Sequence, residues 1–253
     1  KAEAMLDQLP EKDAIALRPS IFSFIGALHA RVGKLEIAAK YLEEALAFVL
    51  IAKEGKEDEL FEYYQDIGRV YSQLNEHEKS IAYYKKAVYL LENQENKDPR
   101  TLYMQLPMSY LGIAESYSSI QDYDNAMRYC QKTVDQIERG GHRTPPFITL
   151  YTYLHFGKVY FRKYELGQAL SYAQKADSLY TANEALMRPN RIFQALSLHV
   201  DYLYAVVYTR MDSLDQAIAH LRQIQQSLAQ KTVDERKDFM GITSNTLTTL
   251  ADV

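Results

Sequence analysis

Apolar side chains recur at intervals of three and four residues along most of the chain. Two such faces follow each other, the first at Ile67, Val70, Tyr71 and Leu74 and the second at Ile81, Tyr84, Val88 and Leu91. This period places the apolar side chains on one face of an α-helix, whereas a half-buried strand would alternate. No Asn-Gly or Asp-Gly turn joins two β-branched runs. The chain is therefore predicted to be all-helical.

Prolines and polar segments separate the apolar stretches. The polar segments cover residues 53–59, 93–100, 139–143 and 229–235. Because proline is tolerated in the first turn of a helix and disrupts its interior, the prolines are predicted to mark helix starts, Pro19 among them. Pro107 is the exception, since it is expected to kink a helix that begins near Pro99.

A short pattern occurs five times along the chain. In each copy a ring residue precedes a small residue by nine positions. The pairs are His29 and Ala38, Tyr71 and Ser80, Tyr117 and Ala126, Tyr160 and Ala169, and Tyr208 and Ala217. Successive ring residues are 42, 46, 43 and 48 positions apart, so the variation in length lies outside this interval. Each copy is therefore predicted to be a helical hairpin of fixed geometry, joined to the next hairpin by a variable segment.

A second small residue lies three positions before each ring residue, at Gly26, Gly68, Ala114, Gly157 and Ala205. Two antiparallel helices approach each other closely only where the side chains between them are small. These residues are therefore expected to face the small residues of the second helix in the same hairpin.

The pattern resembles the tetratricopeptide repeat, which has an aromatic residue, Leu-Gly and Tyr on its first helix and Ala, an aromatic residue and Ala on its second. The resemblance covers residues 19–229 at least. The copies are longer than the family unit of about 34 residues, and in this they are similar to repeats of kinesin light chains and some bacterial regulators. The resemblance implies an all-α fold, a right-handed superhelical α-solenoid of antiparallel helix hairpins in which neighbouring hairpins share one core.

The same resemblance implies about five full repeats and a partial repeat at each end. The approximate bounds of the full repeats are 19–56, 61–98, 107–144, 150–187 and 198–230. Residues 1–9 and 234–250 are expected to be single helices of incomplete repeats, so the sequence is interpreted as a truncated array. Residues 1–253 are predicted to form one elongated domain.

Charge and composition exclude several classes of function. The net charge of −4 disfavours nucleic-acid binding, because phosphate binding needs an excess of basic residues. A single cysteine excludes an internal disulfide and a cysteine-rich zinc site. The longest apolar run, from Ala45 to Ala52, is far shorter than the roughly 20 residues of a membrane helix. A soluble protein is expected, with the cytoplasm slightly favoured over the periplasm.

The sequence offers few candidates for catalysis. His29 and Cys130 fall on packing positions, the histidines lack metalloprotease spacing, and no glycine-rich phosphate loop follows a strand. We therefore predict no catalytic residue, no metal ligand and no cofactor. Four acidic residues are expected to be solvated at helix ends or turns, namely Glu43, Glu44, Asp122 and Asp124.

Asp201 departs from the repeat, because its position normally holds an aromatic residue packed between helices. A buried carboxylate is costly unless it is paired. Either the local register differs, therefore, or Asp201 meets a cation or a hydroxyl. An enzyme would require a sealed pocket around Asp201, His199 and Tyr202, with turnover of a small molecule.

The resemblance also implies a binding surface, because the first helices of such hairpins line a concave groove. In the first hairpin this face would hold Ser23, Phe24, Ala27 and Arg31. The candidate residues in the later hairpins are Asp66, Arg69, Glu115, Tyr151, His155, Lys158, Phe161, Arg162, Tyr202 and Arg210. The last seven are mostly aromatic and basic, so they would suit an extended peptide that carries carboxylates.

Five hairpins without a catalytic set favour a non-catalytic scaffold that binds a protein or peptide partner, acidic or with a free carboxylate. The alternative is a ligand- or peptide-sensing domain of a bacterial transcriptional regulator or signalling protein, whose effector domain lies outside this sequence. Neither hypothesis involves a cofactor, direct nucleic-acid binding or membrane insertion. Homo-oligomerisation through the ends of the solenoid is a further expectation.

Overall fold

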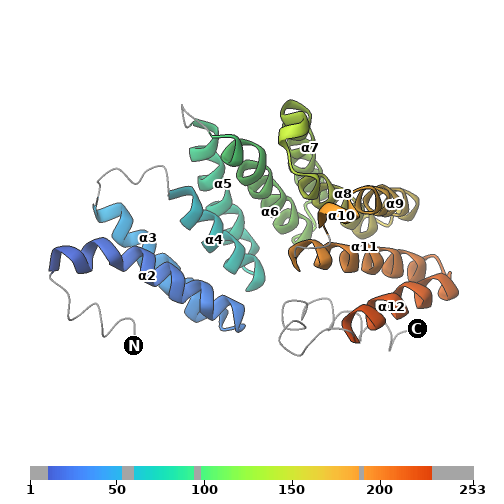
Figure 1. Ribbon diagram of the computed structural model, residues 1–253, viewed down its shortest axis with the longest axis horizontal. Helices are drawn as coiled ribbons and strands as arrows, with labels where there is room; N and C mark the ends of the chain where they lie inside the picture. The colour runs from blue at the N-terminus through green and yellow to red at the C-terminus, as the bar shows by residue number, and fades with distance from the viewer. Residues whose placement is uncertain (1–10, 53–59, 94–97, 188–190, 230–253) are drawn as a thin grey trace. The chain divides into compact units, whose positions relative to one another are not determined.

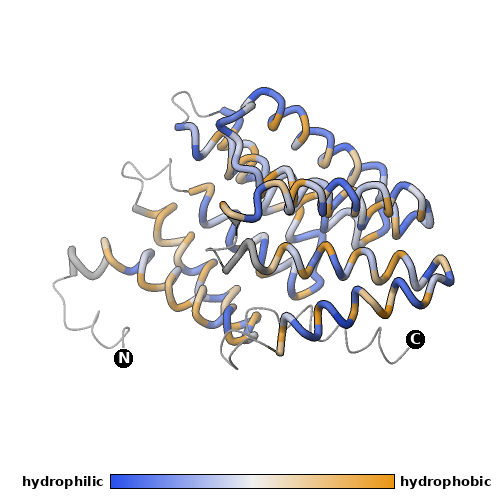
Figure 2. Tube along the Cα trace, turned by 45° about the vertical axis from the view of Figure 1, so that its right-hand side comes forward, coloured by the Kyte–Doolittle hydropathy of each residue, from blue (hydrophilic) through white to orange (hydrophobic). Residues whose placement is uncertain are grey.

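The structure, a computed structural model, describes residues 11–52, 60–93, 98–187 and 191–229 (Figure 1). Within these ranges the chain is helical and contains no strand, as the periodicity predicts. Apolar positions recur turn by turn along the helices (Figure 2). The single helices expected at residues 1–9 and 234–250 lie outside the described residues.

Ten of the helices pair as five consecutive hairpins. The pairs are α2 (Glu11–Arg31) with α3 (Leu35–Ala52), α4 (Leu60–Gln73) with α5 (His77–Asn93), α6 (Leu106–Ser119) with α7 (Tyr123–Gly140), α8 (Pro146–Arg162) with α9 (Leu166–Ala182), and α11 (Arg191–Arg210) with α12 (Leu214–Ala229). Three short elements lie between hairpins: the π-helical turn η2 (Thr101–Gln105), the 3-10 turn η3 (Gly141–Arg143) and α10 (Glu184–Met187). The five hairpins coincide with the five copies of the sequence pattern.

The hairpins are distributed over two compact units, unit 1 (Lys1–Lys132) and unit 2 (Thr133–Val253). In unit 1, α3 packs against α4 and α5 packs against α6. In unit 2, α11 packs against both α8 and α9. Each unit therefore buries its own apolar side chains between neighbouring hairpins, as expected for repeats that cannot bury their apolar face alone. The single domain expected for residues 1–253 stays a prediction.

All five hairpins turn through the same backbone conformation. The residue four positions after each ring residue has a positive φ, between 57° and 75°. These residues are Gly33, Asn75, Gln121, Tyr164 and Asp212. The next N–H donates to the ring residue's carbonyl oxygen, at 2.9 Å in every hairpin. This is the hydrogen-bond pattern of a helix that ends on a left-handed residue, and it fixes the direction in which the second helix leaves.

The small residues of the two helices face each other as predicted. A side chain at Gly26 would meet Leu42 and the Ala38 carbonyl. In the second hairpin the buried Ser80 hydroxyl donates to the Gly68 carbonyl at 2.8 Å. Because the helix backbones approach this closely, the larger side chains fill the space on either side.

Three rings lie together in each of the first four hairpins: the ring residue, the residue seven positions before it, and the residue twelve positions after it. The groups are Phe22, His29 and Tyr41; Tyr64, Tyr71 and Tyr83; Tyr110, Tyr117 and Tyr129; and Tyr153, Tyr160 and Tyr172. The second-helix ring is stacked on the ring residue with centroids 5.5–5.9 Å apart. This arrangement, which we call the ring triad, accounts for much of the chain's tyrosine content.

Two prolines lie inside helical segments. The prediction that Pro19 starts a helix is wrong, because α2 begins at Glu11 and continues through Pro19, which is buried. Tertiary packing here offsets the backbone hydrogen bond that proline removes. Pro107 follows the π-helical turn η2, in which the Leu106 N–H donates to the Thr101 carbonyl five residues back. A wider turn gives a proline ring room beside the preceding carbonyl, so the expected disturbance near Pro107 takes this form.

Candidate functional site

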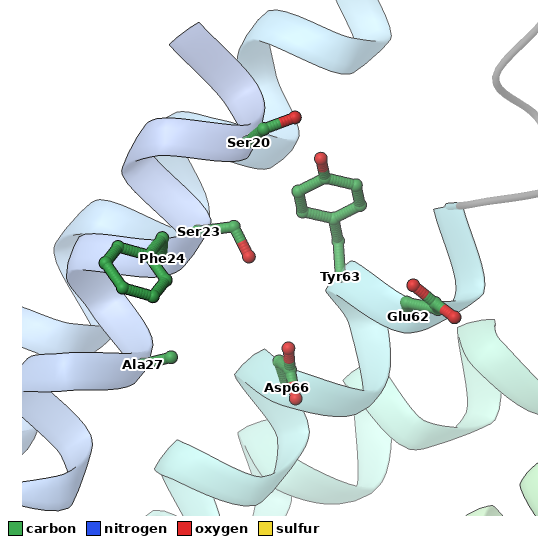
Figure 3. A pocket seen from close by; sticks show the side chains of 7 residues that line it. All are labelled: Ser20, Ser23, Phe24, Ala27, Glu62, Tyr63 and Asp66. Atoms are coloured by element: carbon green, nitrogen blue, oxygen red, sulfur yellow. The ribbon is translucent and has the colours of Figure 1, made fainter. Parts of the chain in front are cut away.

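A pocket of about 490 Å³ opens in unit 1 between the first helices of the first two hairpins (Figure 3). Its lining residues come from two helices. From α2 these are Ser20, Ser23, Phe24 and Ala27, and from α4 they are Glu62, Tyr63 and Asp66. Four of the seven, Ser23, Phe24, Ala27 and Asp66, were predicted to lie on the groove face. The structure therefore brings the predicted faces of these two helices together around one space.

The sequence prediction missed Ser20, Glu62 and Tyr63. Ser20 and Glu62 precede Ser23 and Asp66 by one helical turn, so helix period extended by one turn toward the N-terminus would have found them. Tyr63 occupies a core position and is only 8% exposed, yet its ring stands between the two helices (Figure 3). Phe24, by contrast, is 65% exposed.

Asp66 and Arg69 form an ion pair on the exposed side of α4. The Arg69 Nη2 lies 2.5 Å from the Asp66 Oδ1, one helical turn away. Within the described residues no cation is paired with Glu62, the other carboxylate of the pocket. Glu115 lies on α6, the first helix of the third hairpin, and is half-buried.

The candidate residues of unit 2 divide between packing and exposure. Tyr151 packs at the margin of the core formed by α8, α9 and α11, and burial raises its pKa. Tyr202 packs beside Leu198, Ile224 and Leu228. His155, Lys158, Phe161 and Arg162 are the other half-buried candidates on α8. The two predicted groove tyrosines therefore contribute to the core as well as to the surface.

Phe161 and Arg210 are brought together, with a third residue that the sequence did not indicate. The Arg210 guanidinium lies 4.8 Å from the Phe161 ring centroid and 4.5 Å from that of Tyr164. Tyr164 is the positive-φ residue of the fourth hairpin turn and is 71% exposed. This contact joins the fourth and fifth hairpins through cation–π interactions.

Asp201 has a histidine as its partner, where the sequence predicts a different register or a partner that is a cation or a hydroxyl. The His220 Nδ1–H donates to the Asp201 Oδ1 at 2.9 Å, and both side chains are about one-fifth exposed, at 23% and 22%. The imidazole stacks on the Tyr204 and Tyr208 rings, 4.5 and 5.9 Å away. Asp177 is close enough that desolvation and the Asp201 charge raise its pKa. The contact explains how a carboxylate occupies an aromatic position.

Glu43 is a correction to the expectation of solvated acidic residues. It lies within α3, half-buried, and accepts hydrogen bonds from the hydroxyls of Tyr71 at 2.7 Å and Tyr83 at 2.9 Å. Desolvation and this shared carboxylate raise the pKa of Tyr83 to about 12. Glu43 thus links the first hairpin to the ring triad of the second.

Cys130 and His29 occupy packing positions, as predicted. Cys130 is fully buried, and burial raises its thiol pKa to about 12, so the reactive thiolate is disfavoured. His29 stacks on Tyr41. In the part of the chain that the structure describes, no three His, Cys, Asp or Glu side chains come close enough to hold a metal ion. None of the described helices is long and apolar enough to cross a membrane.

Comparison with known proteins agrees with the repeat pattern. Residues 17–93 match the family model of the tetratricopeptide repeat. No curated protein matches the chain in sequence. The similarity to solved structures therefore concerns the fold.

Three solved structures illustrate this similarity. A Rap protein complexed with Competence and Sporulation Factor is 13% identical, with a TM-score of 0.72 over 96% of this chain and 60% of that chain. The Rap conjugation gene regulator of the plasmid pLS20, in complex with the Phr* peptide, is 16% identical, with a TM-score of 0.69 over 91% of this chain and 64% of that chain. A putative kinesin light chain of Podosopora anserina with TPR-like repeats is 13% identical, with a TM-score of 0.61 over 85% of this chain and 95% of that chain.

The chain thus spans less than two thirds of the two Rap chains. All three likenesses are to all-helical repeat proteins, and they extend over most of the present chain. Together with the family match, they identify residues 17–93 as tetratricopeptide repeats within a chain whose fold is that of a tetratricopeptide-like α-solenoid.

Proposed function

We propose that this chain is a non-catalytic scaffold that binds a peptide segment of a partner through the groove face of its first helices. The observation that carries the proposal is the pocket between α2 and α4, lined by residues of two consecutive first helices. Phe24, a large apolar side chain that is 65% exposed, stands at this pocket. A concave space with an exposed ring at its margin is a suitable place for a ligand segment to bind.

A second face in unit 2 would contribute to the same function. Lys158, Arg162 and Arg210 belong to the first helices of the fourth and fifth hairpins, with Phe161 in contact with Arg210. Basic side chains beside rings suit a partner segment that carries carboxylates. Charge reversal of Lys158 and Arg162 together is expected to weaken such binding while leaving the far-UV circular dichroism of the helices unchanged.

Peptide display provides the direct test. A phage library of random twelve-residue peptides is selected on the immobilised chain, and the enriched peptides are then titrated by isothermal calorimetry. Phe24→Ala should reduce the affinity of enriched peptides by about tenfold, the loss expected when one buried anchor ring is removed. Tyr89→Ala is the matched control, because Tyr89 is 67% exposed on α5, a second helix outside the pocket.

Two outcomes would contradict the proposal. One is the failure of any peptide to be enriched over a blank surface. The other is an equal loss of affinity with Phe24→Ala and Tyr89→Ala, which would place the bound peptides away from the groove face. The binding site for the partner would then have to lie on another surface of the chain.

A sensing role is the second candidate. Two of the similar structures are Rap proteins in complex with a peptide or factor, and this chain spans 60% and 64% of them. A repeat array that binds a peptide better in one conformation than another passes that preference to whatever is attached to it. Small-angle X-ray scattering with and without an enriched peptide tests this role. An unchanged scattering curve at saturation would favour the simple scaffold.

A further inference from the structure

We propose that the pocket between α2 and α4 receives a basic side chain, arginine or lysine, of the bound peptide. This inference rests on the peptide-binding function proposed above and adds the chemistry of one ligand residue. It also gives unit 1 a preference opposite to that expected of the basic residues in unit 2.

Charge is the first argument. Two of the seven lining residues, Glu62 and Asp66, are acidic, and none is basic. The nearby Arg69 pairs with the Oδ1 of Asp66 and offsets its charge, so the uncompensated negative charge of the lining lies on Glu62. The exposed Glu62 has no paired cation among the described residues. A ligand carboxylate in this space would meet like charge, whereas a guanidinium or ammonium group would form charge-assisted hydrogen bonds.

The rings are the second argument. Phe24 and Tyr63 come from opposite sides of the pocket, on α2 and α4 (Figure 3). The long aliphatic stem of arginine or lysine buries well against such rings, and its charged head is attracted to their faces. The same chain already shows this chemistry in unit 2, where the Arg210 guanidinium contacts two rings at 4.8 and 4.5 Å.

Size and hydrogen bonding complete the argument. The hydroxyls of Ser20 and Ser23 stand on the α2 side and can accept hydrogen bonds from the N–H groups of a charged head (Figure 3). A volume of about 490 Å³ is larger than one side chain, so the adjoining peptide backbone also has room. The lining therefore offers carboxylates for the head, rings for the stem and hydroxyls for the remaining donors.

The test compares peptides selected by different forms of the full chain from the same random library. The parent chain should enrich peptides with arginine or lysine at one fixed position. Replacing that residue by citrulline, or by norleucine where it is lysine, should weaken binding about tenfold, since an ion pair with hydrogen bonds is lost. The double variant Glu62→Gln with Asp66→Asn should show little difference between the charged and neutral peptides.

Charge reversal gives a second readout. Glu62→Arg should shift the selected position from basic to acidic residues, whereas Glu78→Arg, an exposed site on α5, should leave the preference unchanged. Peptides that depend on Phe24 but carry no basic residue would overturn this inference and leave the proposed function intact. Failure to enrich any Phe24-dependent peptide would overturn both. A circular dichroism spectrum equal to that of the parent verifies that each variant is folded.

Discussion

The fifth hairpin replaces two members of the ring triad by a hydrogen-bonded pair. Asp201 stands seven positions before the ring residue Tyr208, and His220 stands twelve positions after it. In the second, third and fourth hairpins both positions hold tyrosine. The carboxylate and the imidazole meet at 2.9 Å, so each replacement is accommodated by the other. A single change back to tyrosine would leave one polar group without its partner.

We therefore expect non-additive effects at Asp201 and His220. Asp201→Tyr alone and His220→Tyr alone should each lower the free energy of unfolding, by about 1–2 kcal/mol, because a half-buried polar partner is lost. The double variant rebuilds the ring triad of the other hairpins and should be close to the parent in stability. Urea unfolding of the four proteins gives the coupling energy, expected to be about 1 kcal/mol or more. A coupling near zero would show that the pair contributes no specific interaction.

Gly112 is not one of the small residues of the repeat pattern, yet its position requires glycine because the Tyr84 ring lies close to it. A methyl group added there would overlap the ring of Tyr84, which is buried between hairpins. Gly167, in the first turn of α9, has open space around the same position. Both glycines lie in helices, and they differ in the space available for a Cβ atom.

This difference predicts effects of opposite sign. Gly167→Ala should stabilise the chain by about 0.5–1 kcal/mol, because alanine has the higher helix propensity and a less flexible unfolded state. Gly112→Ala should destabilise it by about 1–3 kcal/mol, since the Tyr84 ring must move out of a packed position. Urea unfolding followed by circular dichroism measures both. Stabilisation by Gly112→Ala would show that the ring shifts at no cost.

At the scale of the element, the hairpin turn is the most regular feature of the chain. The same left-handed residue and the same 2.9 Å hydrogen bond recur although only the first hairpin has glycine there. Residues with a Cβ adopt this conformation at a cost of about 1 kcal/mol. Asparagine and aspartate in two of the turns tolerate it better than glutamine or tyrosine.

Gln121 is the turn residue best suited to a test. Gln121→Gly should raise the free energy of unfolding by about 0.5–1 kcal/mol, because relief of the left-handed strain exceeds the added entropy of the unfolded chain. Gly33→Ala, at the equivalent turn of the first hairpin with φ of 75°, should lower it by a similar amount. Thermal and urea unfolding provide the comparison. Equal effects of the two substitutions would contradict the strain argument.

The positions of helices and turns can be predicted from the sequence where one local rule dominates. The prediction fails where tertiary contacts override that rule. The nine-residue interval predicts every hairpin, because the turn geometry and the small residues are local. Pro19 was assigned to a helix start by its local preference, yet packing retains it inside α2. Glu43 and His220 were not recognised as partners of Tyr83 and Asp201, because those contacts bring together residues far apart in sequence.

The candidate site shows the same division. The resemblance to the repeat family places Ser23, Phe24 and Ala27 of the first hairpin and Asp66 of the second on the groove face, and these four residues line the pocket. The contribution of Tyr63 could not be read from period, because its position also belongs to the core. Its ring is at once part of the packing between α3 and α4 and part of the pocket wall.

At the scale of the whole molecule, the buried side chains of the described residues group into clusters within each unit. Ile67 and Val70 belong to a cluster of the first two hairpins, and Val207 belongs to a cluster of the last two. Val70 and Val207 hold the same position in their hairpins, one residue before the ring residue, and are 1% and 0% exposed. In repeat arrays of this kind, energetic coupling is expected between neighbours and not across the array.

Two pairs of substitutions test this expectation with matched chemistry. Ile67→Val should cost about 1 kcal/mol, and Val70→Ala and Val207→Ala should cost about 2 kcal/mol each, from lost burial and the cavity left behind. Ile67→Val combined with Val207→Ala should be additive within about 0.5 kcal/mol, because the residues lie in different clusters. Ile67→Val combined with Val70→Ala should deviate from additivity by more than that, because both residues line the same cluster. Urea unfolding monitored by circular dichroism gives the free energies.

Strong coupling between Ile67 and Val207, as large as between Ile67 and Val70, would mean that the hairpins act as one cooperative core. Nearest-neighbour packing would then not describe this molecule.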